Sequence, residues 1–303
     1  MFKKILVPLD GSQLAERALM PALALAKAHD GEVLIIRAPV YANEYVTAAA
    51  GLSFTTEKEH GTKRNTCNNY LRAVRQTHVE FDTPIRYKMV DGDPAGVIID
   101  QVHEENIDLI VMTTHGRTGF TRWMFGSVTE RVLRAAPCPI LALRDDITPT
   151  KILVPLDGST LAEQSILPAL AVARCFESDV TLLRVQVPFL DLDAEQQDEV
   201  LQEKHEWMFT TTEAMHRAAL NYLEEVQQKY TTPDLPLRYA VTSNLAADGI
   251  LTFAEKYDFN LIVMTTHGFT GMGRWDYGST TSKVMRDAHQ AMLIIPAPPE
   301  MLN

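Results

Sequence analysis

The feature that most constrains this chain is an internal duplication. The nine letters KILVPLDGS at residues 4–12 recur unchanged at residues 151–159. Such self-similarity indicates that one structural unit occurs twice. The length of 303 residues suits about two domains of ordinary size. We therefore place domain 1 at residues 1–147 and domain 2 at residues 148–303.

Each copy alternates short apolar segments with stretches of helical spacing. In the first copy the apolar segments are residues 5–9, 33–36, 85–90, 109–112 and 139–143. Short apolar strands that alternate with helices are typical of a parallel sheet covered on both faces. The sequence thus predicts an α/β fold with one parallel sheet in each domain.

The sequence predicts some helices of the first copy more clearly than others. Ser12 is suited to cap a helix that runs to about His29, in which Pro21 should cause a kink or an interruption. Residues 41–77 read first as a loop and become helical only from Asn69.

The second copy differs mainly in residues 191–230, which are strongly helical. Residues 191–206 hold seven acids and one lysine. We interpret this acidic helix as a solvated face, and a partner-binding surface is the alternative.

A glycine-rich stretch follows the fourth apolar segment in both copies. It reads TTHGRTGFTRWMFGS from residue 113 and TTHGFTGMGRWDYGS from residue 265. Glycines between a buried strand and a helix start let the backbone approach a phosphate, which free helical N–H groups then bind. The alternative is structural, because Ser127 and Glu130 have the spacing of a capping box. The candidate phosphate-binding residues are Gly116, Gly126, Ser127, Gly268, Gly278 and Ser279.

Three elements of the first copy converge on one edge of the sheet. In open parallel sheets, ligands bind beyond the carboxyl ends of the strands. Asp10 follows the first strand there and could accept hydrogen bonds from a ribose or a base. The backbone of residues 38–40 could meet a flat ring, and Arg117 and Arg122 could offset phosphate charge. Alone, Asp10 would be only a turn residue in an Asp-Gly pair, but the convergence favours a nucleotide site.

Composition narrows the class of protein. The 46% hydrophobic and 22% charged content is typical of soluble globular proteins. No apolar run is long enough to span a bilayer and the amino-terminal residues do not read as a signal peptide, so we expect a cytoplasmic protein with no membrane partner. Three scattered cysteines indicate neither a disulfide framework nor a zinc site.

Charge bears on the partners. The net charge of −11 argues against a nucleic-acid partner. The charge is uneven, because residues 1–147 hold 17 Lys and Arg against 18 Asp and Glu, while residues 148–303 hold 11 against 21. Local electrostatics therefore favour an anionic ligand in the first domain.

No catalytic motif emerges from the sequence. There is no G-x-S-x-G elbow, no G-x4-G-K-[ST] phosphate loop and no H-E-x-x-H zinc helix. His115 and His267 lie within the glycine stretches without an obvious carboxylate partner in sequence, so we interpret them as positional. Trp123 and Trp275 are interpreted as packing residues.

The chain resembles two UspA-type domains of the universal stress protein family in one polypeptide. The resemblance covers nearly the whole chain and rests on ILVPLDGS in both copies, DGDPA at residues 91–95, the THG and GS letters of both glycine stretches, and APCPILAL at residues 136–143. It implies tandem Rossmann-like domains of the adenine nucleotide α-hydrolase type, each a five-stranded parallel sheet of order 3-2-1-4-5 with helices on both faces. It also implies that the domains pair through their fifth strands, and it allows a homodimer of whole chains.

The same resemblance implies binding residues. ATP-binding members of the family carry a loop written G-x2-G-x9-G-[ST], whose first glycine is replaced here by Thr113 and Thr265. A side chain at that place would stand beside the ribose. The resemblance assigns the nucleoside to Asp10 and Asp157, and backbone contacts with adenine to Ala38 and Val185. Further binding positions are Val40, Thr113, Val128 and Thr280.

The second copy departs further from the family pattern. Residues 242–248 lack the glycine and proline of the matching turn, Phe269 replaces Arg117, and Asp276 replaces Met124. One fewer cation and one more acid weaken an anion site. We therefore expect nucleotide binding chiefly in domain 1.

These features predict a cytoplasmic tandem universal stress protein that binds ATP, with or without Mg²⁺. It would act as a stress-response regulatory module with an unidentified protein partner, and binding would order the glycine stretches, residues 41–77 and residues 191–230. Two alternatives remain open. One is a nucleotide-free interaction protein, and the other is a slow Mg²⁺-dependent ATPase, for which the sequence offers no convincing base.

Overall fold

The computed structural model describes residues 1–39, 57–114, 126–144, 148–186, 201–266 and 278–298, with side chains for all of these except residues 57–60 and 201–212. The chain separates into two compact units, Met1–Thr148 and Pro149–Asn303. The domain boundary between residues 147 and 148 stays a prediction.

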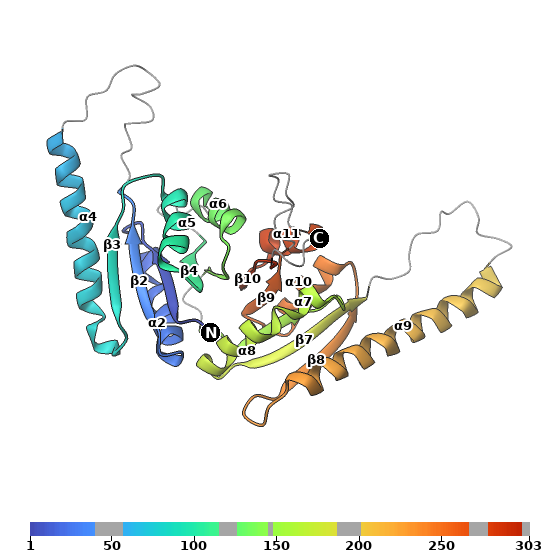
Figure 1. The fold of residues 1–303 in the computed structure, drawn as a ribbon. Coiled ribbons are helices and arrows are strands. Elements are labelled where there is room, and N and C mark those ends of the chain that lie inside the picture. Colours follow the sequence, from blue (N-terminus) through green and yellow to red (C-terminus); the bar gives the residue numbers. More distant parts are fainter. Residues whose placement is uncertain (40–56, 115–125, 145–147, 187–200, 267–277, 299–303) are drawn as a thin grey trace, which may run out of the picture. The chain divides into compact units, whose positions relative to one another are not determined.

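The first unit is built on a parallel sheet (Figure 1). Its strands are β1 (Lys4–Pro8), β2 (Glu32–Arg37), β3 (Ile85–Met89), β4 (Leu109–Thr113) and β5 (Ile140–Leu143). They pair in the order β3-β2-β1-β4-β5, with every pair parallel. The strand order therefore reverses between β1 and β4, which is where ligands bind in such sheets. The predicted α/β class and strand order are confirmed.

The second unit repeats this sheet. Its strands are β6 (Lys151–Pro155), β7 (Asp179–Gln186), β8 (Leu237–Ser243), β9 (Leu261–Thr265) and β10 (Ala291–Ile295). They are parallel in the order β8-β7-β6-β9-β10. Strand β7 pairs with β8 as far as Gln186, whereas the matching strand β2 ends its pairing at Arg37. The second sheet is thus longer at the edge where a ligand would bind.

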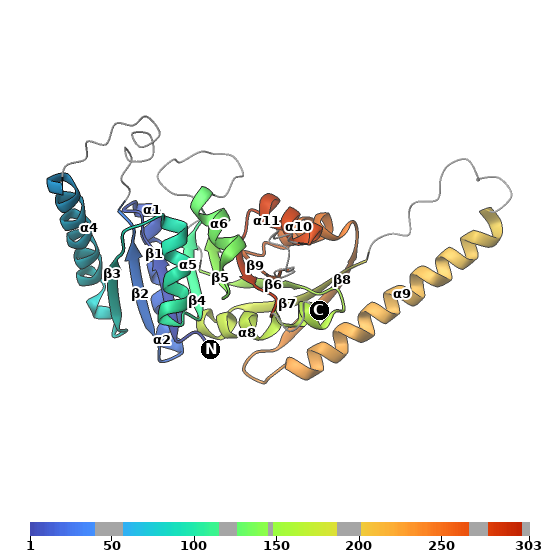
Figure 2. The same cartoon turned by 45° about the horizontal axis from the view of Figure 1, so that its top comes forward.

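Helices connect the strands in both units. They are α1 (Gln13–Glu16), α2 (Leu19–Ala28), α4 (Glu57–Thr77), the 3₁₀ helix η1 (Val79–Phe81), α5 (Pro94–Glu105) and α6 (Ser127–Ala135) in the first unit, and α7 (Thr160–Glu163), α8 (Ile166–Phe176), α9 (Leu201–Tyr230), α10 (Ala246–Lys256) and α11 (Ser279–Asp287) in the second. Right-handed crossovers place α2 and α4 on one face of the first sheet and α5 and α6 on the other. Figure 2 shows α5 and α6 side by side, and the two helices are in contact.

The helix expected from Ser12 to His29 is divided into α1 and α2. Ser12 caps α1, because its Oγ accepts a hydrogen bond from the Ala15 N–H at 3.1 Å. Pro21 lies in the first turn of α2 and Pro168 in the first turn of α8, where a missing N–H costs little. The interruption expected from the proline is present, but it precedes the proline.

Helix α4 begins earlier than the sequence indicated. We expected helix only from Asn69, but α4 starts at Glu57. Its buried residues Cys67, Leu71 and Val74 have the spacing of one helical face. No comparable apolar spacing precedes Cys67, which is why the first half of the helix was interpreted as a loop.

The second unit's long helix is only partly within the described residues. Helix α9 covers residues 201–230 of the expected helix 191–230, and residues 191–200 lie outside the described part. The side chains of residues 201–206 are likewise outside it. The two interpretations of the acidic segment therefore stay predictions.

Candidate functional site

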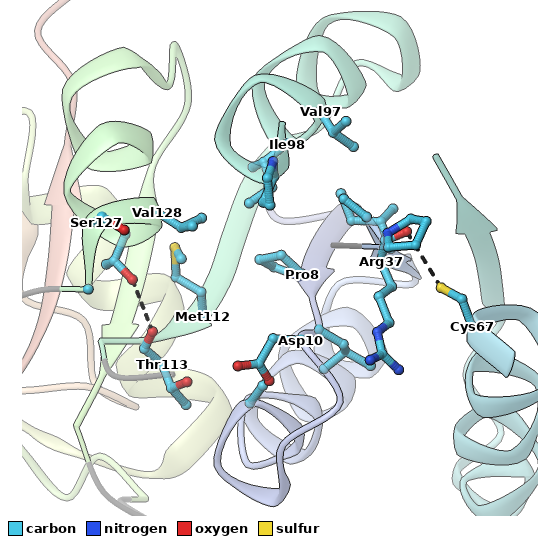
Figure 3. Close-up of a pocket in the computed structure, with 18 of the residues that line it drawn as sticks. Pro8, Asp10, Arg37, Cys67, Val97, Ile98, Met112, Thr113, Ser127 and Val128 are labelled. Atoms are coloured by element: carbon cyan, nitrogen blue, oxygen red, sulfur yellow. Dashed lines mark hydrogen bonds between the residues drawn. The ribbon is translucent and has the colours of Figure 1, made fainter. Parts of the chain in front are cut away.

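A pocket of about 490 Å³ opens at the carboxyl ends of β1, β2 and β4 in the first unit. This volume lies within the range of small-molecule sites. The pocket brings together six of the residues that the sequence singled out, from four different elements (Figure 3). These residues are Asp10, Ala38, Thr113, Gly126, Ser127 and Val128.

Asp10 stands in the turn that follows β1. Its Oδ1 accepts a hydrogen bond from the Ser12 N–H at 2.8 Å, and Gly11 next to it has a φ of +89°, which favours glycine. The structural role suggested for an Asp-Gly turn is therefore present. Figure 3 shows the Asp10 carboxylate in the middle of the pocket, between Thr113 and Arg37. The same side chain shapes the turn and faces the cavity.

The backbone of Ala38 faces the gap beyond the end of β1. The Ile36 carbonyl accepts from the Leu9 N–H at 2.8 Å, on the β1 side, and the Arg37 carbonyl accepts from Val90 at 3.2 Å, on the β3 side. Backbone polar groups alternate sides along a strand, so the N–H and C=O of Ala38 point to the β1 side. Strand β1 ends at Pro8, so these groups face the pocket.

The opposite end of the pocket is the start of helix α6. The Gly126 carbonyl accepts from the Glu130 N–H at 2.9 Å, so Gly126 is the N-cap and Ser127 the first helical residue. The proposed capping box led by Ser127 is therefore wrong, and Glu130 instead pairs with Arg134 at 2.7 Å. The N-terminal N–H groups of α6, with their partial positive charge, lie at the pocket.

The junction between β4 and α6 is held by two hydrogen bonds. The Gly126 N–H donates to the Thr114 carbonyl at 2.9 Å, and the Thr129 hydroxyl donates to the Thr113 carbonyl at 3.3 Å. The second unit repeats the latter bond between Thr281 and the Thr265 carbonyl at 3.2 Å. Each helix start is thus anchored to the end of the preceding strand.

One wall of the first pocket comes from α4 and was missed by sequence reasoning. The wall residues are Thr62, Lys63, Thr66 and Cys67. Cys67 is buried, and burial raises the pKa of its thiol, which lowers the fraction present as the nucleophilic thiolate. The spacing of Thr62 and Thr66 on one helical face was the only available signal, and it needed the helix to be recognised first.

A cluster of three side chains joins α4 to the Asp10 turn. The Arg37 guanidinium lies 4.6 Å from the centre of the Tyr70 ring and against Gly11, where an added Cβ would be 2.6 Å from its Nη2. The Tyr70 hydroxyl donates to Glu16 at 2.8 Å. Burial, and then the Glu16 carboxylate, raise the pKa of Tyr70 well above its usual range.

The cluster recurs in the second unit. Tyr222 donates to Glu163 at 3.2 Å, and Arg184 donates to the Leu156 carbonyl at 3.3 Å. Burial and Glu163 raise the pKa of Tyr222 as well. The two copies therefore keep the same connection between the long helix and the first turn.

The second unit has a smaller pocket of about 180 Å³. It gathers five of the residues expected there, namely Asp157, Val185, Gly278, Ser279 and Thr280. The Asp157 carboxylate accepts from the Ser159 N–H at 2.9 Å and from its hydroxyl at 2.6 Å. Within the described residues, α9 contributes nothing to the lining of this pocket.

Several expected site residues lie outside the described residues. They are Val40, Gly116, Arg117 and Gly268 among the binding positions, and Arg122, His115, His267, Trp123 and Trp275 among the others. The expectations for them stay predictions.

An ion pair ties the two helices beside each pocket, with the acid at a different position in each unit. In the first unit Arg131 of α6 makes two bonds of 2.7 Å to Asp93, the N-cap of α5. In the second unit Lys283 of α11 bonds Asp248, in the first turn of α10, at 2.6 and 2.8 Å. The pair is kept although the acid has moved by about one helical turn.

Each unit is thus a doubly wound α/β domain with a pocket at its topological switch point, a class of fold that binds its ligands at that place. The chain belongs to the universal stress protein family, whose sequence pattern matches residues 1–144 and again 149–296. The tandem arrangement expected from the sequence is confirmed by these two matches.

Individual relatives agree with this assignment. A universal stress protein of Methanocaldococcus jannaschii is 34% identical over 144 residues, which are 48% of this chain and 83% of the relative. The protein YxiE of Bacillus subtilis, also a universal stress protein, is 28% identical over 48% of this chain and 100% of its own length. A crystal structure of a universal stress protein from Archaeoglobus fulgidus matches 98% of this chain and 99% of its own with a TM-score of 0.71 and 18% identity, which shows a shared fold.

The described residues also bear on membrane-spanning segments and metal sites. None of the helices there combines the length and the apolar character needed to cross a membrane. The described side chains also contain no group of three or more His, Cys, Asp or Glu residues placed to hold a metal ion.

Proposed function

We propose that the first unit binds an adenine nucleotide, with ATP as the expected ligand, and that the chain acts in the cytoplasm as a nucleotide-dependent regulatory module of stress responses. The observation that carries this proposal is the make-up of the first pocket. It combines outward-facing backbone groups at Ala38, a carboxylate at Asp10 and the start of a helix at Ser127 around one cavity. These groups suit a base edge, a ribose and a phosphate respectively.

The charges of the lining residues support an anionic ligand. Among the described lining residues, Asp10 carries the only carboxylate, while Arg37 and Lys63 carry positive charge. Mg²⁺ prefers carboxylate and phosphate oxygens and keeps several waters. A Mg²⁺ ion would therefore be held mainly by the nucleotide phosphates.

The experiment that tests the proposal is nucleotide extraction combined with titration. Freshly purified full-length chain is denatured, and any released nucleotide is identified by mass spectrometry and related to the amount of protein. Titration calorimetry with ATP then compares the wild type with Asp10→Ala and with Asp157→Ala, the matched change in the second unit. We expect about one nucleotide per chain and at least about a ten-fold loss of affinity in Asp10→Ala, equivalent to about 1.4 kcal/mol. The loss in Asp157→Ala should be much smaller.

A chain that carries no nucleotide and binds none at millimolar ATP would contradict the proposal. It would favour the interaction protein without nucleotide. Equal losses in the two variants would contradict the preference for the first unit.

Assembly is a separate part of the proposal. Strands β5 and β10 each end the sheet of their unit and are apolar throughout, and an open apolar edge invites pairing. We propose that these two edges pair with each other, as the family resemblance implies. Whether two whole chains associate is tested by light scattering after gel filtration, where a mass near 33.9 kDa means one chain and twice that mass means a homodimer.

A further inference from the structure

Helix α4 carries a lysine into the first pocket. The buried face of the helix is formed by Val74, Leu71 and Cys67, and the Cys67 Sγ lies 3.9 Å from the Arg37 carbonyl at the end of β2. Lys63 is the next residue of this face towards the helix start, so it lies beyond the strand end, and it lines the pocket. Among residues 61–66 it is the only one that is not exposed. The face that packs on the sheet thus ends in a partly buried lysine at the cavity.

The cation next to it in sequence has a different place. The Arg64 Nη1 lies 3.2 Å from a carboxylate oxygen of Asp91, and both of these side chains are exposed. Arg64 therefore belongs to the outer surface, whereas Lys63 belongs to the cavity. Two adjacent residues of equal charge can thus be compared directly.

The second unit keeps this helix face but not its charge. Tyr70 and Tyr222 occupy the same place in the two units, since each donates to the acid after the first turn. The residue seven positions before Tyr222 is Met215, where the first unit has Lys63. The rest of the face stays buried and apolar, with Val226, Leu223 and Ala219. Met215 itself is 41% exposed.

Stability alone would favour the opposite arrangement of these two residues. Partial burial costs a charged side chain part of its hydration, and exposure removes the benefit of an apolar one. Yet the lysine occupies the less exposed of the two places and the methionine the more exposed. The stem of a lysine packs well on apolar surface, but a methionine stem would do so without a charge. Departures of this kind from the burial rule are expected at functional sites.

We propose that Lys63 is a ligand-binding residue of the first pocket and that its ammonium group recognises the phosphate charge of the nucleotide. An ammonium group only donates hydrogen bonds and attracts phosphate oxygens as a point charge. Figure 3 shows Ser127 of α6 and Cys67 of α4 on opposite sides of the cavity. A triphosphate held at the start of α6 therefore faces the wall that carries Lys63.

The inference rests on the proposed function and deepens it, because it adds a residue of α4 to the site and assigns it to the charge of the ligand. Asp10 carries the only carboxylate among the described lining residues, so Lys63 and Arg37 together give this lining an excess of positive charge. At the place of Lys63 the second unit has the uncharged Met215. The difference agrees with the preference expected for the first unit.

The test removes the charge of Lys63 in the full-length chain. Lys63→Met introduces the residue that the second unit has at this place, so we expect it to fold. Arg64→Met is the matched control, because it removes one positive charge from the neighbouring residue on the outer surface. Lys63→Arg keeps the charge at the pocket. Thermal unfolding is followed for every variant, and ATP affinity is measured by calorimetry at low and at high salt.

We expect Lys63→Met to bind ATP at least about five-fold more weakly than wild type at low salt, because the attraction between the cation and the triphosphate is lost. The loss should fall to about two-fold at high salt, since screening already weakens this attraction in the wild type. Lys63→Arg should retain most of the affinity. Arg64→Met should stay within about two-fold of the wild type, as its charge is exposed and paired.

Three results would overturn the inference and leave the proposed function standing. They are a folded Lys63→Met variant that binds ATP like the wild type, a loss of the same factor at both salt concentrations, and an equal loss in Arg64→Met. Lys63→Gln, which keeps a polar side chain, replaces Lys63→Met under the same criteria if the latter unfolds. A wild-type chain that binds no ATP overturns the proposed function, and this inference with it.

Discussion

The hydrogen bond between Tyr70 and Glu16 offers a test of the connection between α4 and the first turn. Tyr70→Phe removes only the hydroxyl, so the ring can stay beside the Arg37 guanidinium. The lost bond is 2.8 Å long and joins a half-buried phenol to a carboxylate. Hydrogen bonds to charged groups contribute about 1.5–3 kcal/mol when buried. Because Glu16 is partly exposed and water can replace the phenol, we expect a cost of about 1–1.5 kcal/mol.

The second unit supplies a matched comparison. Tyr222 lies farther from its acceptor, at 3.2 Å, and Lys229 stands 3.6 Å from the other oxygen of Glu163. The Glu163 carboxylate therefore keeps a partner when the hydroxyl is removed. Tyr222→Phe should cost about 0.5 kcal/mol, near the lower limit for a hydrogen bond. Tyr257→Phe, on an exposed side chain, is the control and should have almost no effect.

The assay has to resolve the two units, because one melting temperature is not well defined for a two-domain chain. Hydrogen exchange followed by mass spectrometry reports on α4 and α9 separately. A cost of about 1 kcal/mol corresponds to roughly five-fold faster exchange through local opening. We therefore expect faster exchange in α4 of Tyr70→Phe and a smaller change in α9 of Tyr222→Phe. Equal changes in the two helices, or a larger change in α9, would refute this reasoning. It holds that the shorter bond of Tyr70, and the second partner that Lys229 gives to Glu163, make the Tyr70 bond the more important of the two.

The pH dependence gives a second check on the same bond. The pKa of Tyr70 is raised in the folded chain by burial and by Glu16, so the neutral phenol is favoured there. The stabilisation is therefore fully present below the unfolded pKa of about 10 and is lost only as the pH rises through the higher folded pKa. The difference between wild type and Tyr70→Phe should stay constant from about pH 6 to pH 9.

The remaining predictions concern a surface ion pair, the buried thiol of Cys138 and the partly buried thiol of Cys175. The bond from Arg131, and then the Gly96 N–H, lower the pKa of Asp93, so this pair stabilises the fold above about pH 4 and is lost as the pH falls through the folded pKa. Arg131→Met should therefore move the acid-unfolding midpoint, followed by circular dichroism, to higher pH; an unchanged midpoint would contradict the assignment. Burial raises the pKa of Cys138 to about 12 and that of Cys175 to about 11. Both thiols should react with a disulfide reagent at pH 8 much more slowly in the native chain than in urea, and similar rates would show that they are accessible.

The sheet could be predicted from the sequence because its signals are local. Short apolar segments bounded by turns define the strands, and their alternation with helices dictates parallel pairing. The positions of Asp10 and Ala38 followed at once, since both come directly after strands whose ends meet at one edge. Their convergence in one pocket needed no knowledge of side-chain packing.

The missed features depend on contacts between segments far apart in the chain. The first half of α4 has no apolar stripe of its own, so its contribution to the pocket through Lys63 could not be foreseen. Ser127 was suited to a capping box by spacing, but Gly126 is the N-cap, and its N–H is held by the Thr114 carbonyl just after β4. The sequence also gives no sign that Gly249 lies against Val185, where an added Cβ would be 2.6 Å from Cγ1 of the valine.

The displaced acid of the ion pair beside each pocket also constrains the history of the chain. If both units descend from one copy that had a single acid, one lineage has lost that acid and gained the acid at the other place. A route through an intermediate with acids at both places keeps the basic partner on the next helix paired at every step. A route that loses the first acid before gaining the second leaves that cation without its carboxylate. An order of substitutions in which the second acid is gained before the first is lost therefore costs the fold less stability.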